Sequence, residues 1–235
     1  MEQNIVYDYS YDDIEALADA QNKLYDPERL EKLKPLDVYD FAEKQLGLNI
    51  DWKYLTPIGS LDAMLVYSDC IYPVWPRYFK QFDLPTSQDL LEHFPPQWMT
   101  IKANTIVVCQ SVLDRGHDYK ERFSVAHECG HFLLHPQGFT MASCEAFEPY
   151  EYGSYKKMTP QQRHESHANR FAAALLMPQG ITRETYMKLR NSDIYPTSNT
   201  SDRILAIMSI MAEMCNVTVE SMSYRLSALG LIKIM

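Results

Sequence analysis

Two histidines separated by three residues, His127 and His131, lie within a segment that the sequence predicts to be one α-helix. Asp118 and Glu121 form a capping-box pattern where this helix would begin, and Pro136 would end it. Side chains four residues apart project from the same face of a helix, about one turn from each other. The two imidazoles can therefore converge on one metal ion, and the chain must fold so that another element supplies the remaining protein ligand.

Glu128 and Gly130 complete the pattern between the two histidines. Glu128 is turned about 100° from His127 around the helix, which is unfavourable for a third ligand but suitable for contact with a metal-bound water molecule. Gly130 has no side chain and so leaves room for a ligand. This pattern indicates a zinc site of the metallopeptidase type, although two histidines and a glutamate also occur on ordinary solvated helix faces.

A second predicted helix offers the third ligand. Thr159 is its expected N-cap, and Gln162 stands three residues later, as in a capping box. Glu165 lies in the first half of this helix, and the small side chain of Ala168 lets the helix approach the histidine pair closely. We therefore expect the carboxylate of Glu165 to complete the zinc site.

Other polar residues on the two helices are alternatives. His135 stands eight residues after the first histidine, about 12 Å along the helix, which is too far to share a tetrahedral ion and favours a packing or hydrogen-bonding role. His167 points to nearly the opposite side of its helix from the glutamate, whereas His164 is rotated by about 100° and remains a competing ligand. Asn169 is a candidate partner for the second ring nitrogen of a ligand histidine, or an ordinary exposed asparagine.

Two motifs carry a family resemblance. Residues 122–135, with the sequence RFSVAHECGHFLLH, are similar to the active-site helix of the ImmA/IrrE metallopeptidases. Residues 165–178, with the sequence ESHANRFAAALLMP, resemble that family's second motif, ExxANxFAxxLLMP. The two motifs together, in this order and spacing, are much more specific than the histidine pair alone. The resemblance covers about residues 100–180 and extends weakly to the C-terminus.

The resemblance implies a thermolysin-like (gluzincin) core. It implies His127, His131 and Glu165 as zinc ligands and Glu128 as the general base. It also implies limited proteolysis of a regulatory protein, because family members typically cleave helix-turn-helix repressors or antitoxins and so relieve transcriptional repression.

The expected chemistry is zinc-assisted peptide hydrolysis. Zinc lowers the pKa of a bound water molecule to about 7, and Glu128 would take the proton of that water and later protonate the leaving amine. A further donor should stabilise the oxyanion. The sequence offers four candidates for this donor and does not choose among them: His117, Tyr150, Tyr152 and Tyr155. Each of them is also compatible with an ordinary loop residue that has no catalytic role.

The predicted elements indicate an α+β fold with three segments. Residues 1–48 read as an N-terminal helical segment, and residues 181–235 as a C-terminal helical segment of helix-turn-helix type. Residues 49–180 form the expected metallopeptidase core, with strands at 63–67 and 104–109 in a small mixed or antiparallel sheet that packs on the histidine-bearing helix.

Two further segments of this core are less regular. Prolines interrupt the region between the two predicted strands, where a short helix is expected near residues 87–94. Residues 137–158 form a long connection that we expect to contain a strand or a flap, since long connections in compact domains are more often functional than idle.

Composition excludes several classes of protein. The net charge of −9 argues against non-specific nucleic-acid binding and fits a basic protein partner equally well. Residues 196–235 contain three basic and three acidic residues, so this segment lacks the basic surface expected of a DNA-binding element. Apolar stretches such as residues 171–177 are too short to cross a membrane, for which about 20 residues are needed. The five scattered cysteines, without a basic N-terminal region, predict a reducing, cytoplasmic location.

Two functional interpretations follow. The first is a zinc-dependent endopeptidase of narrow specificity. The second is a catalytically silent module that keeps its metal site and acts by protein–protein binding. The presence of both histidines, Glu128 and Glu165 favours the first interpretation without refuting the second.

Overall fold

The computed structural model describes residues 8–79, 92–116, 118–135, 142–145, 158–192 and 200–233. The chain divides into two compact units, one centred on Val38–Ala168 and the other on Tyr9–Asp37 together with Asn169–Met235. These units differ from the three segments expected from the sequence, because the N-terminal helix groups with the C-terminal helices and the border falls inside a single helix. The short helix expected near residues 87–94 lies mostly outside the described residues.

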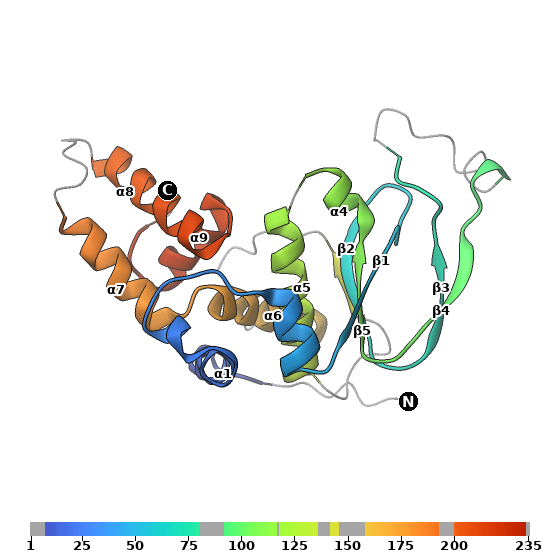
Figure 1. Cartoon of the computed structure of the whole chain (residues 1–235), viewed down its shortest axis with the longest axis horizontal. Coiled ribbons are helices and arrows are strands. Elements are labelled where there is room, and N and C mark those ends of the chain that lie inside the picture. The colour runs from blue at the N-terminus through green and yellow to red at the C-terminus, as the bar shows by residue number, and fades with distance from the viewer. Residues whose placement is uncertain are drawn as a thin grey trace. The chain divides into compact units, whose positions relative to one another are not determined.

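The first unit contains a mixed four-stranded sheet, as predicted (Figure 1). Its strands, in spatial order, are β1 (Asn49–Lys53), β5 (Thr105–Cys109), β2 (Leu61–Val66) and β6 (Ala142–Glu145). β1 is parallel to β5, and the other neighbours are antiparallel. The two strands predicted from the sequence correspond to β2 and β5, and β6 is a strand within the long connection between the motif-bearing helices.

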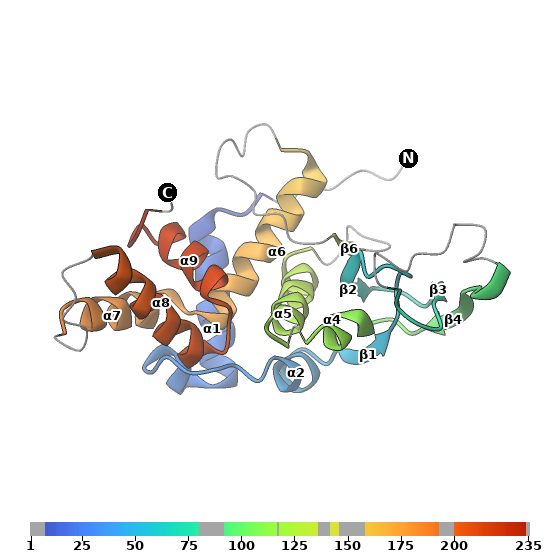
Figure 2. The ribbon, with the colours of Figure 1, turned by 90° about the horizontal axis from the view of Figure 1, so that it is seen from above.

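The two central strands are buried along their whole length, because both faces of the sheet are covered. Helix α5 (Asp118–Leu134) packs on β2 and β5 from one side, and a two-stranded antiparallel sheet lies on the other side (Figure 2). That second sheet consists of β3 (Cys70–Val74) and β4 (Gln97–Ile101). The apolar cluster between the two sheets includes Met64, Val107 and Ile101. The predicted α+β architecture, with a small sheet packed on the histidine-bearing helix, is therefore confirmed.

Helix boundaries in the first unit follow the predicted signals with two changes. The capping box of α6 (Pro160–Leu176) is present: the Thr159 N–H donates to Gln162 Oε1 at 2.9 Å, and the Gln162 N–H donates to Thr159 Oγ1 at 3.2 Å. In α5, Asp118 is already the first helical residue and so is not the N-cap. The carboxylate of Glu121 instead accepts a hydrogen bond from the indole N–H of Trp52 at 2.9 Å.

The second change is in the short helix that precedes β1. Within the helical segment predicted for residues 1–48, it begins as α2 (Val38–Asp40) but continues as a π-helical turn, η2 (Phe41–Gln45). Gly47, with a φ of 67°, ends it. α2 packs on α5 and thereby helps to bury the helix that carries the two histidines.

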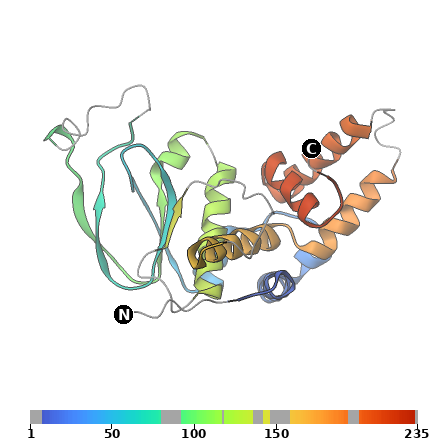
Figure 3. The same ribbon diagram turned by 180° about the vertical axis from the view of Figure 1, so that it is seen from behind.

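The second unit is helical. Its elements are α1 (Tyr11–Tyr25), the 3-10 turn η1 (Pro27–Leu30), the C-terminal half of α6, α7 (Gln179–Arg190), α8 (Thr200–Cys215) and α9 (Val219–Ala228). The last three are drawn in orange and red in Figure 3. In the described part of the chain, no single helix is long and apolar enough to span a membrane. α8 and α9 pass that test only as a pair, with a bend of 105° between them.

Buried charges hold this unit together. Glu15 on α1 is 2% exposed and accepts hydrogen bonds from Arg225 Nη1 at 2.6 Å and Nη2 at 2.8 Å, and Arg170 lies 3.0 Å away. The C-terminal carbonyls of α6 lack partners within the helix. Arg29, which is 1% exposed, donates to the carbonyls of Leu175 and Leu176 at 3.1 Å each and so satisfies them.

The buried pair of Glu15 and Arg225 predicts a stability effect that depends on pH. Glu15→Gln leaves the guanidinium of Arg225 buried without its counter-charge, so the free energy of unfolding at pH 7 should fall by about 3 kcal/mol. Burial alone would raise the pKa of Glu15, but hydrogen bonds and charge from Arg225 and Arg170 outweigh it and hold the pKa below 4.5. The stabilisation is therefore complete above about pH 4.5 and fades as the pH falls through the lowered pKa.

Urea unfolding of wild type and variant at pH 7 and in steps down to pH 3 measures this effect. Glu184→Gln is the matched control, because Glu184 is an exposed partner of Lys188 on α7 and its loss should change stability by less than about 1 kcal/mol. If the loss of unfolding free energy in Glu15→Gln stays constant over the whole pH range, the pair of Glu15 and Arg225 is not the source of the pH-dependent stability.

Gly59 predicts a second, steric effect. Its φ is 63°, and a Cβ atom there would lie 2.6 Å from Ser111 Oγ. Gly59→Ala should therefore cost about 2–3 kcal/mol, since it adds a clash to the strain of a left-handed backbone. Gly47→Ala is the control: its φ is also positive, at 67°, but nothing lies within 4 Å of the added atom, so it should cost only about 1 kcal/mol. Equal midpoints of denaturant unfolding for the two variants would show that the close approach does not matter.

Candidate metal centre

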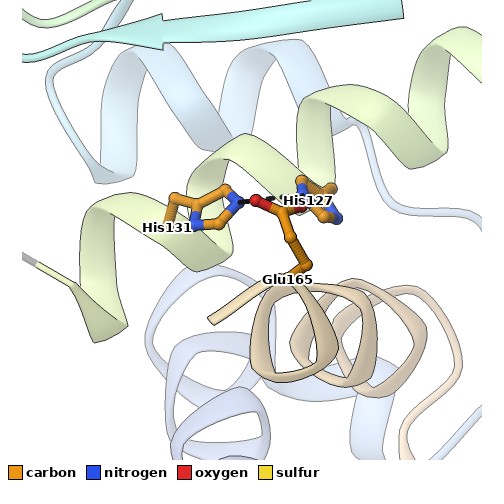
Figure 4. Close-up of side chains that lie close together, drawn as sticks. All are labelled: His127, His131 and Glu165. Carbon is orange, nitrogen blue, oxygen red and sulfur yellow. Dashed lines mark hydrogen bonds and ion pairs between the residues drawn. The ribbon is translucent and has the colours of Figure 1, made fainter. Parts of the chain in front are cut away.

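Helix α5 presents both histidines of the sequence pattern from its buried face. His127 is 1% exposed and His131 is fully buried. Figure 4 shows their rings extending from α5 toward α6, from which Glu165 reaches up so that its carboxylate lies between the two rings. The structure thus brings together the three side chains that the sequence predicted as zinc ligands.

The donor atoms of these three residues lie close together. His127 Nε2 is 2.9 Å from His131 Nε2 and 3.1 Å from Glu165 Oε2, and His131 Nε2 is 3.4 Å from Glu165 Oε1. With metal–nitrogen distances of about 2.0–2.1 Å, two ligand atoms of a tetrahedral zinc ion lie about 3.3 Å apart. The residues therefore fit such an ion, and they form the one group of this kind among the described residues.

Electrostatics favour the protonation states that a metal requires. Burial alone would raise the pKa of Glu165, but hydrogen bonds from His127 and His131 outweigh it and hold the pKa well below its usual range. Burial lowers the pKa of His131, which favours the neutral ring. A carboxylate and a neutral imidazole are the forms in which these side chains bind a metal.

Glu128 is fully buried beside the first ligand. Burial raises its pKa to about 8, with an opposing effect from His127 and a smaller upward effect from Glu165. Within the described residues neither carboxylate oxygen makes a hydrogen bond of ordinary geometry, although the backbone N–H of Leu65 is close enough to lower the pKa slightly. A buried carboxyl with unsatisfied oxygens is costly unless a ligand or reacting group uses it.

A cluster of three further histidines lies beside the metal ligands. The Nδ1 atom of His135 is 3.1 Å from Nδ1 of His131, and its ring centroid is 4.4 Å from that of His164 and 5.8 Å from that of His167. All three are buried, and none belongs to the metal-binding group found among the described residues. The sequence predicted a packing or hydrogen-bonding role for His135, but it considered His164 and His167 only as ligands and did not predict that the three rings form a cluster. The i, i+4 repeat on the first helix and the i, i+3 pair on the second were the signals for the cluster.

The remaining site predictions concern the oxyanion donor and the residue that supports a ligand histidine. His117, Tyr150, Tyr152 and Tyr155 lie outside the described residues, so the oxyanion donor stays a prediction. Asn169 is a half-buried residue of α6, one turn after Glu165. Its predicted hydrogen bond to a ligand histidine stays a prediction as well.

The ligand set predicts the effect of single substitutions on metal binding. His131→Ala and Glu165→Gln each remove one of three protein ligands, so the affinity for zinc should fall by more than about 100-fold. Loss of a residue that only hydrogen-bonds to a ligand costs up to about 100-fold, and loss of a ligand itself should cost more. His164→Asn removes a neighbouring buried imidazole from outside the group and should bind zinc nearly as well as wild type. Competition with a chromophoric chelator measures all three. Retained affinity in Glu165→Gln, with lost affinity in His164→Asn, would transfer the role of third ligand to His164.

Comparison with known proteins places this site in a family. Residues 111–227, about half of the chain, match the peptidase family described as the IrrE N-terminal-like domain. This match includes α5 and α6, the two helices that carry the candidate ligands. No curated protein matches the chain significantly. The chain belongs to the ImmA/IrrE family of metallopeptidases.

Proposed function

We propose that the protein is a zinc-dependent endopeptidase of the HExxH, gluzincin type. The observation that supports this best is the position of Glu128, a buried carboxyl adjacent in sequence to a ligand of the His127–His131–Glu165 group. Two imidazoles and one carboxylate are typical of catalytic rather than structural zinc sites, because three protein ligands leave one position open. Structural sites use four protein ligands, and most of them are cysteines.

Each residue of the site has a defined role in this proposal. His127 Nε2, His131 Nε2 and one oxygen of Glu165 hold the ion. Zinc, when bound, supplies a Lewis acid that lowers the pKa of water to about 7. A carboxylate oxygen of Glu128 accepts the proton of the attacking water and later donates it to the leaving amine. Because α5 and the sheet bury Glu128, bulk water does not compete for this proton.

The proposed substrate is a helix-turn-helix transcriptional repressor or antitoxin that is cut at one or a few sites. This choice is supported by the resemblance to the ImmA/IrrE family and by charge. The chain has a net charge of −9, whereas a helix-turn-helix protein carries a basic face for DNA. Opposite charges increase the rate at which two proteins meet, and they do so less at high salt.

We further propose a cytoplasmic location. Four cysteines within the described residues, Cys70, Cys109, Cys129 and Cys215, are all free thiols. Free thiols in this number fit a reducing compartment better than an oxidising one. A repressor or antitoxin would also be found there.

The general-base role predicts a separation of binding from catalysis. Glu128→Gln keeps the size and the neutral hydrogen-bonding ability of the side chain but cannot accept the proton. It should bind zinc like wild type and cleave the substrate about 100- to 10,000-fold more slowly. The assay incubates zinc-loaded protein with helix-turn-helix proteins encoded beside its gene and follows the fragments by mass spectrometry. Glu184→Gln, the same substitution at an exposed residue, is the control and should cleave at the wild-type rate.

Two outcomes would overturn the proposal. Cleavage by Glu128→Gln at the wild-type rate would exclude the proposed base. A zinc-loaded wild-type protein that binds such a partner tightly and leaves it intact would support the catalytically silent metal-binding module instead.

A further inference from the structure

The two ring nitrogens of His131 have different neighbours. Nε2 faces the other candidate ligands, at 2.9 Å from His127 Nε2 and 3.4 Å from Glu165 Oε1. Nδ1, on the other side of the ring, is 3.1 Å from Nδ1 of His135. The metal-facing and the protein-facing sides of this ligand are therefore both defined by the structure.

This arrangement allows one assignment of protons. A neutral imidazole has one N–H donor and one acceptor nitrogen. Nε2 of His131 must be unprotonated to bind a metal, so its proton is on Nδ1 and is donated toward His135. His135 must then accept at its own Nδ1 and carry its proton on Nε2.

We propose that His135 is a positioning residue that fixes the tautomer and ring orientation of His131 and so presents Nε2 to the metal. The inference rests on the proposed function, because it presupposes that His131 binds zinc. Metal-bound histidines usually donate their second N–H to a carboxylate, a carbonyl or water. In this chain an imidazole takes that role. The rings of His127 and His135 then lie on opposite sides of His131, one turn away in each direction along α5.

The surroundings of His135 hold its ring in place. The backbone N–H of His135 donates to the backbone carbonyl of His131 at 2.9 Å, so the helical geometry continues to this residue and keeps the two side chains on one face. His135 is fully buried, and the ring of His167 on α6 is stacked on it at an interplanar angle of 15°. His164 contributes a third ring, with its centroid 4.4 Å away. A ring confined in this way loses little further freedom when it accepts the hydrogen bond.

Three substitutions of His135 test the geometry of the acceptor. His135→Leu removes it. His135→Asn places an amide oxygen near the position of Nδ1, whereas His135→Gln places its amide one bond further out, near Nε2. Loss of such an outer partner typically weakens metal binding by about 10- to 100-fold. Zinc affinity, measured by chelator competition, should therefore fall by this factor in the Leu and Gln variants and return to within about threefold of wild type in the Asn variant.

The tautomer itself gives a second readout that a purely structural role would not change. In zinc-loaded protein labelled with ¹⁵N at histidine, His131 should show a protected Nδ1–H signal in wild type and in His135→Asn. The signal should be lost or exchange rapidly in His135→Leu. His167→Phe is the matched control, since it removes a buried imidazole from the same cluster, keeps an aromatic ring against His135 and leaves the acceptor in place, and it should retain both the signal and the affinity.

The outcomes separate this inference from the proposed function. If wild-type protein binds zinc and the Leu, Asn and Gln variants bind it equally well, His135 has no positioning role, while the metal site stands. Equal losses in His167→Phe and His135→Leu would also overturn the inference. If His135→Leu does not fold, the Asn and Gln variants decide, because both are polar and differ in where the amide lies. Failure of wild-type protein to bind zinc would refute the proposed function itself.

Discussion

The convergence of two imidazole nitrogens and a carboxylate on one point is the constraint on which the first unit depends. His127 and His131 alone would place two buried lone pairs 2.9 Å apart, and Glu165 adds a negative charge to the same space. Such an arrangement is unfavourable without a proton or a cation among the groups. The side chains of the two helices nevertheless meet there: α5 packs on β2 and β5, and Glu165 extends from α6 toward the two rings (Figure 4). The fold thus holds donors in place for an ion, so the protein need not reorganise when the ion binds.

The sheet explains why a helix with so many polar residues can be buried. β2 and β5 carry buried, mostly apolar side chains on both faces, and α5 covers one face while the β3–β4 pair covers the other. α5 packs on the sheet, its side chains Val125 and Ala126 are fully buried, and its histidines extend toward α6. Glu128 lies in the same buried environment. The rise in its pKa to about 8 follows directly from this burial.

The sequence predicted those features that are encoded locally. The capping residues Thr159 and Gln162 defined the start of α6, and short runs of largely apolar residues marked β2 and β5. The histidine pair of the metal-binding group followed from helical periodicity, because His127 and His131 lie one turn apart on α5. The part that the sequence could not predict is the part that depends on pairing between distant segments.

Three examples show where local signals end. The β3–β4 pair was not predicted, because its strands are separated by more than 20 residues and Pro73 lies inside β3, where proline argues against a strand. The buried arginine Arg225 contacts Glu15 across 210 residues, and no periodic pattern relates the two. The hydrogen bond between His131 and His135 is local, and the sequence predicted a packing or hydrogen-bonding role for His135 without identifying the ligand His131 as its partner.

Two buried glutamates show how such a structure separates stability from function. Glu15 is 2% exposed, but two arginines of the chain neutralise it and satisfy its oxygens, so its burial is complete and no external partner is needed. Glu128 is 0% exposed, and the described residues provide neither a counter-charge in contact with it nor a hydrogen bond of ordinary geometry. A protein that keeps such a carboxyl beside a metal-binding group accepts a loss of stability there. In the proposed mechanism, the attacking water molecule is a group with the chemistry to satisfy Glu128.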